Sequence, residues 1–90
     1  MLSTELKKAC DRLIEAKRLK EEFEVEYTLK EAQKIHSAEV QAYANQTLRD
    51  AKVKVLLEED YRKLVGLRTE YSIAYYLWET LKTIAGGSQW

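Results

Sequence analysis

The stretch KIHSAEVQAYANQT (residues 34–47) interrupts a chain whose remaining sequence is rich in Lys, Glu, Leu and Tyr. Charged residues become sparse here, the single histidine occurs, and Ser, Asn and Thr follow within a few positions. Ser37 suits the N-cap of a short helix over AEVQAYA, because its hydroxyl group accepts a hydrogen bond from an amide of the first turn. Asn45 and Gln46 would then lead into a second long helix. The stretch therefore predicts the corner (residues 36–47) of an antiparallel helical hairpin.

A single continuous helix of about 80 residues is the alternative, because helix-forming residues continue through 38–44 and no Pro or Gly forces a break. The chain contains no proline and three glycines, and 33% of its residues are charged. This composition favours long amphipathic helices over a sheet. We therefore expect an all-α fold in one domain, residues 1–90.

The first long helix is predicted at about residues 4–35. Ser3 and Thr4 precede it, and Glu5 lies in its first turn, where a carboxylate is favoured by the helix dipole. Apolar residues then recur every three or four positions, as on one face of a helix. They are Leu6, Ala9, Leu13, Ala16, Leu19, Phe23 and Tyr27.

The second long helix is predicted at about residues 48–85. Thr47 and Asp50 have the spacing of a capping box at its start. Gly86 and Gly87 are expected to end it, because glycine readily adopts the left-handed conformation common at helix C-termini. Residues 86–90, which include Trp90, are expected to form a flexible tail. The apolar positions are Val53, Leu57, Tyr61, Leu64, Leu67, Tyr71, Ala74, Trp78, Leu81 and Ala85.

Each predicted helix also carries a second set of apolar residues, which the seam of a hairpin does not need. A helix that is apolar on two sides is usually covered on two sides. A hairpin of two helices has a thin core, so we expect a homodimer that forms a four-helix bundle. The predicted interface residues are Val55, Ile73, Leu77, Ile84, Val25 and Leu29.

The net charge argues against several classes of function. Fifteen basic residues balance fifteen acidic ones, and each half of the chain is also balanced, whereas nucleic-acid binding usually requires a positive surplus. The single cysteine, Cys10, allows no intrachain disulfide and fits a reducing compartment. No signal peptide and no membrane-length apolar stretch is recognised, so we expect a cytoplasmic protein that does not bind membranes.

Catalytic and metal-binding motifs are weak. His36 has Glu39 one turn away, but a metal site needs three or four ligands. Glu21 and Glu24 share the spacing of a magnesium-binding Glu-x-x-Glu motif of helical nucleotide pyrophosphohydrolases. The matching Glu-x-x-Asp motif fails, because Leu57 precedes Asp60 by three positions. We therefore predict no catalytic residue, no cofactor and no metal, and a metal-dependent hydrolase is the remotest alternative.

The aromatic run YSIAYYLW (residues 71–78) lies near basic residues and could stack on nucleic-acid bases. Such residues at helical spacing more often form a core or an interface. Arg62, Lys63 and Arg68 are the candidate contacts if the chain binds nucleic acid.

The order of segments resembles that of small helical proteins of tailed phages and prophages. The matching features are a charged first helix, the corner SAEVQAYA, and a second helix that carries AKVKVLLEEDYRKLVGLRTE before an aromatic end. Many of these are encoded beside recombination or replication genes. The resemblance spans most of the chain and implies an accessory role in the host cytoplasm, without catalytic residues. We expect a non-enzymatic interaction protein that self-associates and binds another phage or host protein. A nucleic-acid-binding accessory protein of a replication or recombination module is the alternative.

Overall fold

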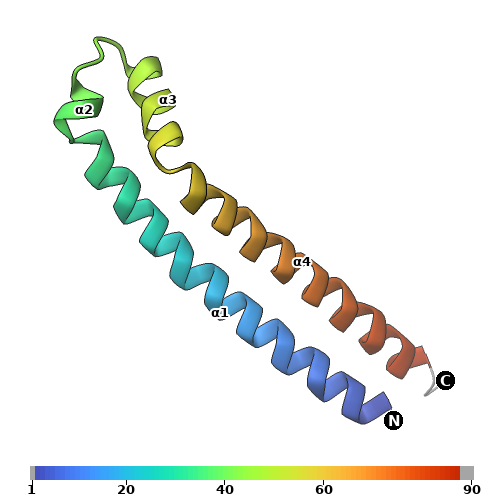
Figure 1. The fold of residues 1–90 in the computed structure, drawn as a ribbon. Helices are drawn as coiled ribbons and strands as arrows, with labels where there is room; N and C mark the ends of the chain where they lie inside the picture. The colour runs from blue at the N-terminus through green and yellow to red at the C-terminus, as the bar shows by residue number, and fades with distance from the viewer. Residues whose placement is uncertain (1, 88–90) are drawn as a thin grey trace. The chain divides into compact units, whose positions relative to one another are not determined.

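The computed structural model describes residues 2–87, and 92% of it is helical, with no strand in this range. Figure 1 shows four helices, α1 (Leu2–Ile35), α2 (Ala38–Gln41), α3 (Gln46–Leu56) and α4 (Glu58–Gly87). Helix α1 packs against α4 as in an antiparallel hairpin, with the short helix α2 at the corner. The predicted all-α hairpin is therefore confirmed, and the alternative of one continuous helix is wrong.

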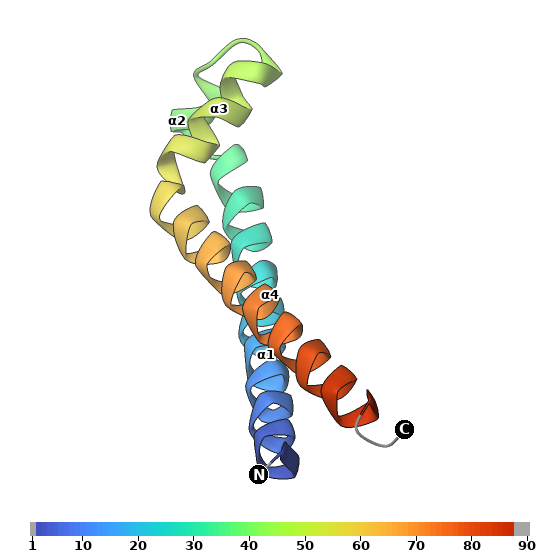
Figure 2. The same cartoon turned by 90° about the vertical axis from the view of Figure 1, so that its right-hand side faces the viewer.

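The chain divides into two compact units, which we name by their place in the hairpin. The terminal unit comprises Met1–Glu21 and Gly66–Trp90, and the corner unit comprises Glu22–Val65. In the terminal unit the first part of α1 lies beside the second part of α4, and Figure 2 shows these two segments diverging toward the chain ends. The corner unit contains the rest of α1, the start of α4, and α2 and α3.

The polar residues of the corner close the turn by hydrogen bonding to its backbone. The Ser37 hydroxyl oxygen accepts a bond from the Val40 amide at 3.4 Å and donates one to the Lys34 carbonyl at 2.7 Å. The Gln41 side chain donates to the Ile35 carbonyl. The Lys34 carbonyl also accepts a bond from the Ser37 amide at 3.0 Å, so side-chain and backbone donors together cover the carbonyl end of α1. Val40 of α2 is completely buried.

The start of the second arm differs from its sequence prediction. Asn45, and not Thr47, caps α3, since its side-chain oxygen accepts a bond from the Leu48 amide at 2.9 Å. Asp50 accepts a bond from the Gln46 side chain at 2.8 Å. The predicted capping box is therefore wrong, because the asparagine two positions earlier has the extended backbone that a cap requires.

The helix predicted at 48–85 is interrupted at Leu57. Its φ and ψ of −107° and 22° separate α3 from α4, although its amide still bonds to the Val53 carbonyl at 3.0 Å. The acidic run EED (residues 58–60) forms the first turn of α4, where carboxylates are stabilised by the helix dipole. The acidic run therefore favours a new helix start over continuation of α3.

The ends of the helices also shift slightly. Helix α1 begins at Leu2, and α4 continues through Gly86 to Gly87 without a positive φ among the described glycines. A difference of one or two residues is ordinary for helix ends. The predicted tail and left-handed glycine end at 86–87 are therefore wrong, because both glycines belong to α4. The rest of the predicted tail, residues 88–90 with Trp90, lies outside the described residues.

Two of the predicted seam positions are exposed and not buried. Leu19 and Tyr61 belong to the apolar rows predicted from the sequence, yet they are 39% and 50% exposed. The Tyr61 ring still lies 6.3 Å from the Tyr27 ring, centroid to centroid, in the corner unit. The residues that are buried are Ala9, Ala16, Phe23, Tyr27, Val40, Val53, Leu57, Leu64 and Ala74.

Candidate interaction surface

The helix seam of the terminal unit is built from alanines. Ala9 and Ala16 on α1 and Ala74 on α4 are the buried side chains among the described residues of this unit. Small side chains allow two helix backbones to approach closely, but each alanine removes little apolar surface from water. The larger side chains Leu13, Leu67, Tyr71, Trp78 and Leu81 remain half-buried beside this seam.

A row of uncharged residues, which we call the α4 stripe, runs along α4 beside the alanine seam, about 80° around the helix from Ala74. Ile73, Leu77 and Ile84 are 50%, 40% and 53% exposed. Gly66 and Thr80 complete the stripe, and both are exposed. At about 100° per residue all five positions fall on one side of α4.

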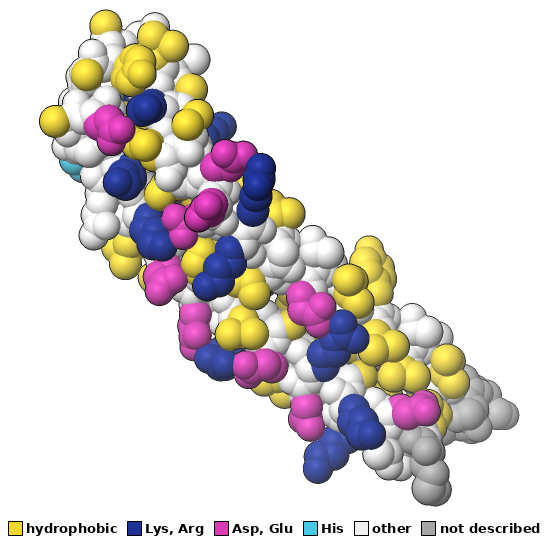
Figure 3. Space-filling model, viewed as in Figure 1, with side chains coloured by type: hydrophobic (Ala, Val, Ile, Leu, Met, Phe, Trp, Pro, Cys, Tyr) yellow, Lys and Arg dark blue, Asp and Glu magenta, His cyan; other side chains and the backbone are white. Residues whose placement is uncertain are grey.

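Charged residues lie largely outside the α4 stripe. At its margin the Glu70 carboxylate pairs with Arg12 of α1, with 2.7 Å between the guanidinium nitrogen and the oxygen. Lys82 pairs with Glu79 at 2.9 Å, and the helical spacing places both on another face of α4. The hydrogen bond to Glu79 raises the pKa of Lys82. Figure 3 shows hydrophobic side chains gathered along α4 in this unit, whereas most charged side chains lie over α1.

The aromatic residues of the terminal unit form a second surface feature. The Tyr75 ring centroid lies 6.3 Å from that of Tyr71 and 6.1 Å from that of Tyr76. The Lys20 ammonium group lies 4.8 Å from the Tyr71 centroid, within the range of a cation–π interaction. Tyr71 therefore has an intrachain partner, whereas Tyr76 is 72% exposed. This cluster extends the apolar surface of α4 beyond the stripe.

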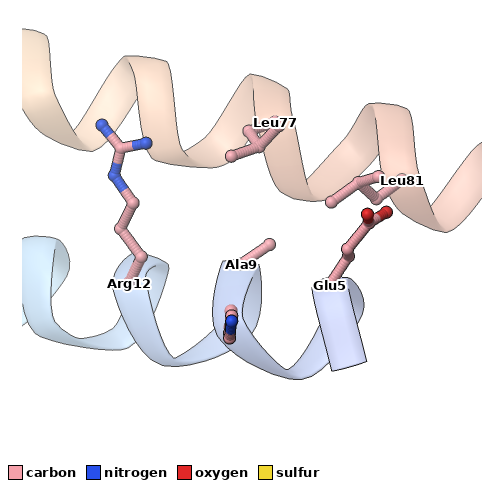
Figure 4. Close-up of a pocket in the computed structure, with 6 residues that line it drawn as sticks. Glu5, Ala9, Arg12, Leu77 and Leu81 are labelled. Carbon is pink, nitrogen blue, oxygen red and sulfur yellow. The ribbon is translucent and has the colours of Figure 1, made fainter. Parts of the chain in front are cut away.

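A shallow pocket of about 370 Å³ lies in the terminal unit between α1 and α4. Figure 4 shows Glu5 and Arg12 reaching from α1 toward α4 on either side of Ala9, opposite Leu77 and Leu81. The charged groups around it are Glu5, Lys8 and Arg12, and Arg12 is already bound to Glu70. The small Ala9 side chain leaves this space under the leucines, so the pocket reflects thin packing and presents no catalytic constellation.

The predicted interface residues of the corner unit are also exposed. Val25 and Leu29 lie one turn apart on α1, and Val55 lies on α3, with exposed fractions between 58% and 65%. They stay predictions, because exposure in one chain does not identify what covers them. The six predicted interface residues are thus divided between the units, with Ile73, Leu77 and Ile84 in the terminal unit.

The candidate nucleic-acid contacts are exposed, but two of them have partners within the corner unit. Arg62 pairs with Glu58 at 2.8 Å, and the Lys63 ammonium lies 4.5 Å from the Phe23 ring centroid. Consecutive helical residues point about 100° apart, so Arg62 and Lys63 do not form one basic surface. Arg68 belongs to the terminal unit and is exposed.

His36 is exposed at the corner beside the Ser37 cap. Within residues 2–87 no three His, Cys, Asp or Glu side chains gather closely enough to hold a metal ion. The same described range contains no helix with the length and apolar character needed to span a bilayer.

The sequence pattern identified Ile73, Leu77 and Ile84 of the α4 stripe. It did not predict that alanines would be the buried residues of the terminal unit. Ala9 and Ala16 were placed in the seam, and their spacing of seven residues was the signal that small side chains occupy its centre. Gly66 was also missed, although a glycine inside a predicted helix is itself a signal.

Comparison with protein-family models, curated proteins and solved structures found no match.

Proposed function

We propose that the chain is a non-enzymatic interaction protein that self-associates, with a homodimer as the favoured form. The observation that carries the proposal is the arrangement of the terminal unit. Its buried residues are alanines, whereas Ile73, Leu77 and Ile84 are exposed in a row without a charge. Burying such side chains contributes about 1.5–3 kcal/mol each when they are fully covered, so a second chain would supply the core that this unit lacks.

Replacement of two stripe residues tests this proposal. Ile73→Glu with Leu77→Glu would place two carboxylates where a partner is expected, and each would be desolvated without a counter-charge. We expect the dimer to dissociate, with the dissociation constant rising by about a hundredfold or more. Light scattering and sedimentation equilibrium would measure the mass of both proteins. Ser72→Glu with Thr83→Glu is the matched control, because both positions are exposed on another face of α4.

A parent protein that is monomeric at high micromolar concentration would refute self-association. The exposed residues would then have to be covered by a different protein. Binding of a phage or host protein is the second part of the proposal, and it rests on the resemblance of the corner and second arm to phage and prophage accessory proteins.

Nucleic-acid binding is the alternative function. The contacts of Arg62 and Lys63 do not favour it, since a phosphate would have to compete with Glu58 and Phe23 for them. A gel-shift assay with single- and double-stranded DNA at two salt concentrations would separate the alternatives. Salt-sensitive binding that is weakened by Arg62→Gln would favour the nucleic-acid role, and absence of a shift would favour protein binding.

A further inference from the structure

Four of the five positions of the α4 stripe, all except Thr80, have a spacing that is the same in both chain directions. Gly66 and Ile73 are seven residues apart, Ile73 and Leu77 are four apart, and Leu77 and Ile84 are again seven apart. At about 100° per residue these four positions lie within about 40° of one another on α4. A stripe with this symmetric spacing matches an antiparallel copy of itself.

Gly66 provides an independent observation. It lies inside a helix, has no positive φ, and a Cβ built there would meet nothing within 4 Å. Neither its backbone conformation nor packing within the chain therefore requires glycine, although glycine is among the least favourable residues in a helix interior. A close approach by another molecule is one condition under which a helix needs glycine at an exposed position.

We infer that two copies of the chain pair through antiparallel α4 helices, with the two-fold axis between Ile73 and Leu77. In this register Ile84 of one copy lies over Gly66 of the other, and Ile73 lies opposite Leu77. The large Ile84 side chain thus packs on Gly66, which has no side chain, and the two-fold axis repeats this contact once. The inference rests on the proposed self-association and adds its direction, register and contact residues.

The charges of the terminal unit are compatible with this pairing. Between residues 66 and 84 the charged residues are Arg68, Glu70, Glu79 and Lys82. Three of these lie on other faces of α4, and Glu70 at the margin is already neutralised by Arg12. No like charges are therefore brought together along the stripe. A parallel pairing would instead place Gly66 beside Gly66 and Ile84 beside Ile84, which leaves a gap at one end.

Disulfide trapping tests the direction and register. In a Cys10→Ser background, Gly66→Cys and Ile84→Cys variants would be oxidised separately and as an equimolar mixture. We expect a covalent dimer in the mixture alone. In the antiparallel register, residue 66 lies opposite residue 84 of the partner. Two Gly66→Cys sites are then about 27 Å apart along the helix, and a disulfide requires Cα atoms within about 7 Å.

Each outcome decides the inference. Covalent dimers from a single variant indicate parallel pairing and overturn it. A non-covalent dimer by light scattering without a cross-link in the mixture also overturns it, while the proposed self-association stands. A Cys10→Ser parent that is monomeric refutes both, and the stripe then serves a different partner.

A size exchange tests the contact between residues 66 and 84. Gly66→Ile should weaken the dimer by about tenfold or more, because two large side chains would overlap. Adding Ile84→Ala should restore most of the affinity, and Ser72→Ile on another face of α4 should leave it unchanged. An unchanged dissociation constant for Gly66→Ile would show that no partner approaches this glycine and would overturn the assignment.

Discussion

The two units of the hairpin bury different kinds of side chain. The corner unit buries Phe23, Tyr27, Val40, Val53, Leu57 and Leu64, whereas the described part of the terminal unit buries Ala9, Ala16 and Ala74. A buried aromatic or leucine removes far more apolar surface from water than an alanine does. The corner unit is thus the part with a core of its own, and the terminal unit is a helix pair with buried alanines and large apolar residues exposed on its surface.

This difference shows that one amphipathic pattern can lead to different packing in two parts of the same chain. In the corner unit the apolar rows meet one another across the turn. In the terminal unit the fully enclosed positions are taken by small residues, and several large apolar residues stay exposed. We therefore expect mutations in the corner unit to change folding stability and mutations on the α4 stripe to change association.

The largest effect is expected at Phe23. Its ring is buried and lies beneath the Lys63 ammonium group, so Phe23→Ala should lower the free energy of unfolding by about 3–5 kcal/mol. Urea denaturation followed by circular dichroism would measure it. Tyr76→Ala, which removes a 72% exposed aromatic from the terminal unit, should change stability by less than about 0.5 kcal/mol in the monomer. Equal losses of unfolding free energy in Phe23→Ala and Tyr76→Ala would contradict the difference between the two units.

The alanine seam gives the next effect. Ala74 is completely buried, so Ala74→Leu should force α1 and α4 apart and cost about 1–3 kcal/mol. Ser72→Leu adds the same side chain at an exposed position and should stay within about 0.5 kcal/mol of the parent. Thermal unfolding of both variants measures the difference. A stabilised Ala74→Leu protein would mean that the seam has spare room and that the helices do not approach closely.

The corner caps should have a smaller effect. Ser37→Ala and Asn45→Ala each remove a side-chain acceptor from a helix N-terminus, which typically costs about 1 kcal/mol. Thr47→Ala is the control and should have less effect on stability, because Thr47 has the sequence signature of a cap whereas Asn45 is the N-cap of α3. Hydrogen exchange should show faster exchange at the corner in the two cap variants. If Thr47→Ala lowered the free energy of unfolding more than Asn45→Ala, the capping box predicted from the sequence would be supported instead.

The smallest effect is expected from the ion pair of the corner unit. The Lys30 ammonium group donates a hydrogen bond to Asp60 at 2.8 Å, and this bond raises the pKa of Lys30 despite partial desolvation, which lowers it. A raised lysine pKa stabilises the fold below the pKa of the unfolded chain, and this contribution is lost as the pH rises through the folded value. Stability should therefore decline slightly above about pH 10. In melts at pH 8 and pH 11, the decline should be smaller in Asp60→Asn, and an equal decline in both proteins would exclude the pair as its cause.

The corner was predictable because its signals are local. The Ser37 hydroxyl group and the amide that it caps are three residues apart, and the three-and-four spacing of apolar residues is also a property of neighbouring positions. These signals predicted two long helices, a turn between them and a short helix within the turn. The choice of Asn45 over Thr47 as a cap was less predictable, because both residues can cap and the backbone conformation decides between them.

The sequence by itself determined the helices, their antiparallel connection and the presence of two apolar faces, since each of these follows from side-chain type and periodicity along the chain. Tertiary structure alone decided that Leu19 and Tyr61 stay exposed and that alanines occupy the centre of the terminal unit. Periodicity indicates which side of a helix is apolar, but it contains no information about the distance to the opposing helix. That distance depends on the side chains of both helices at each level, so it is set only when residues far apart in the sequence pack together.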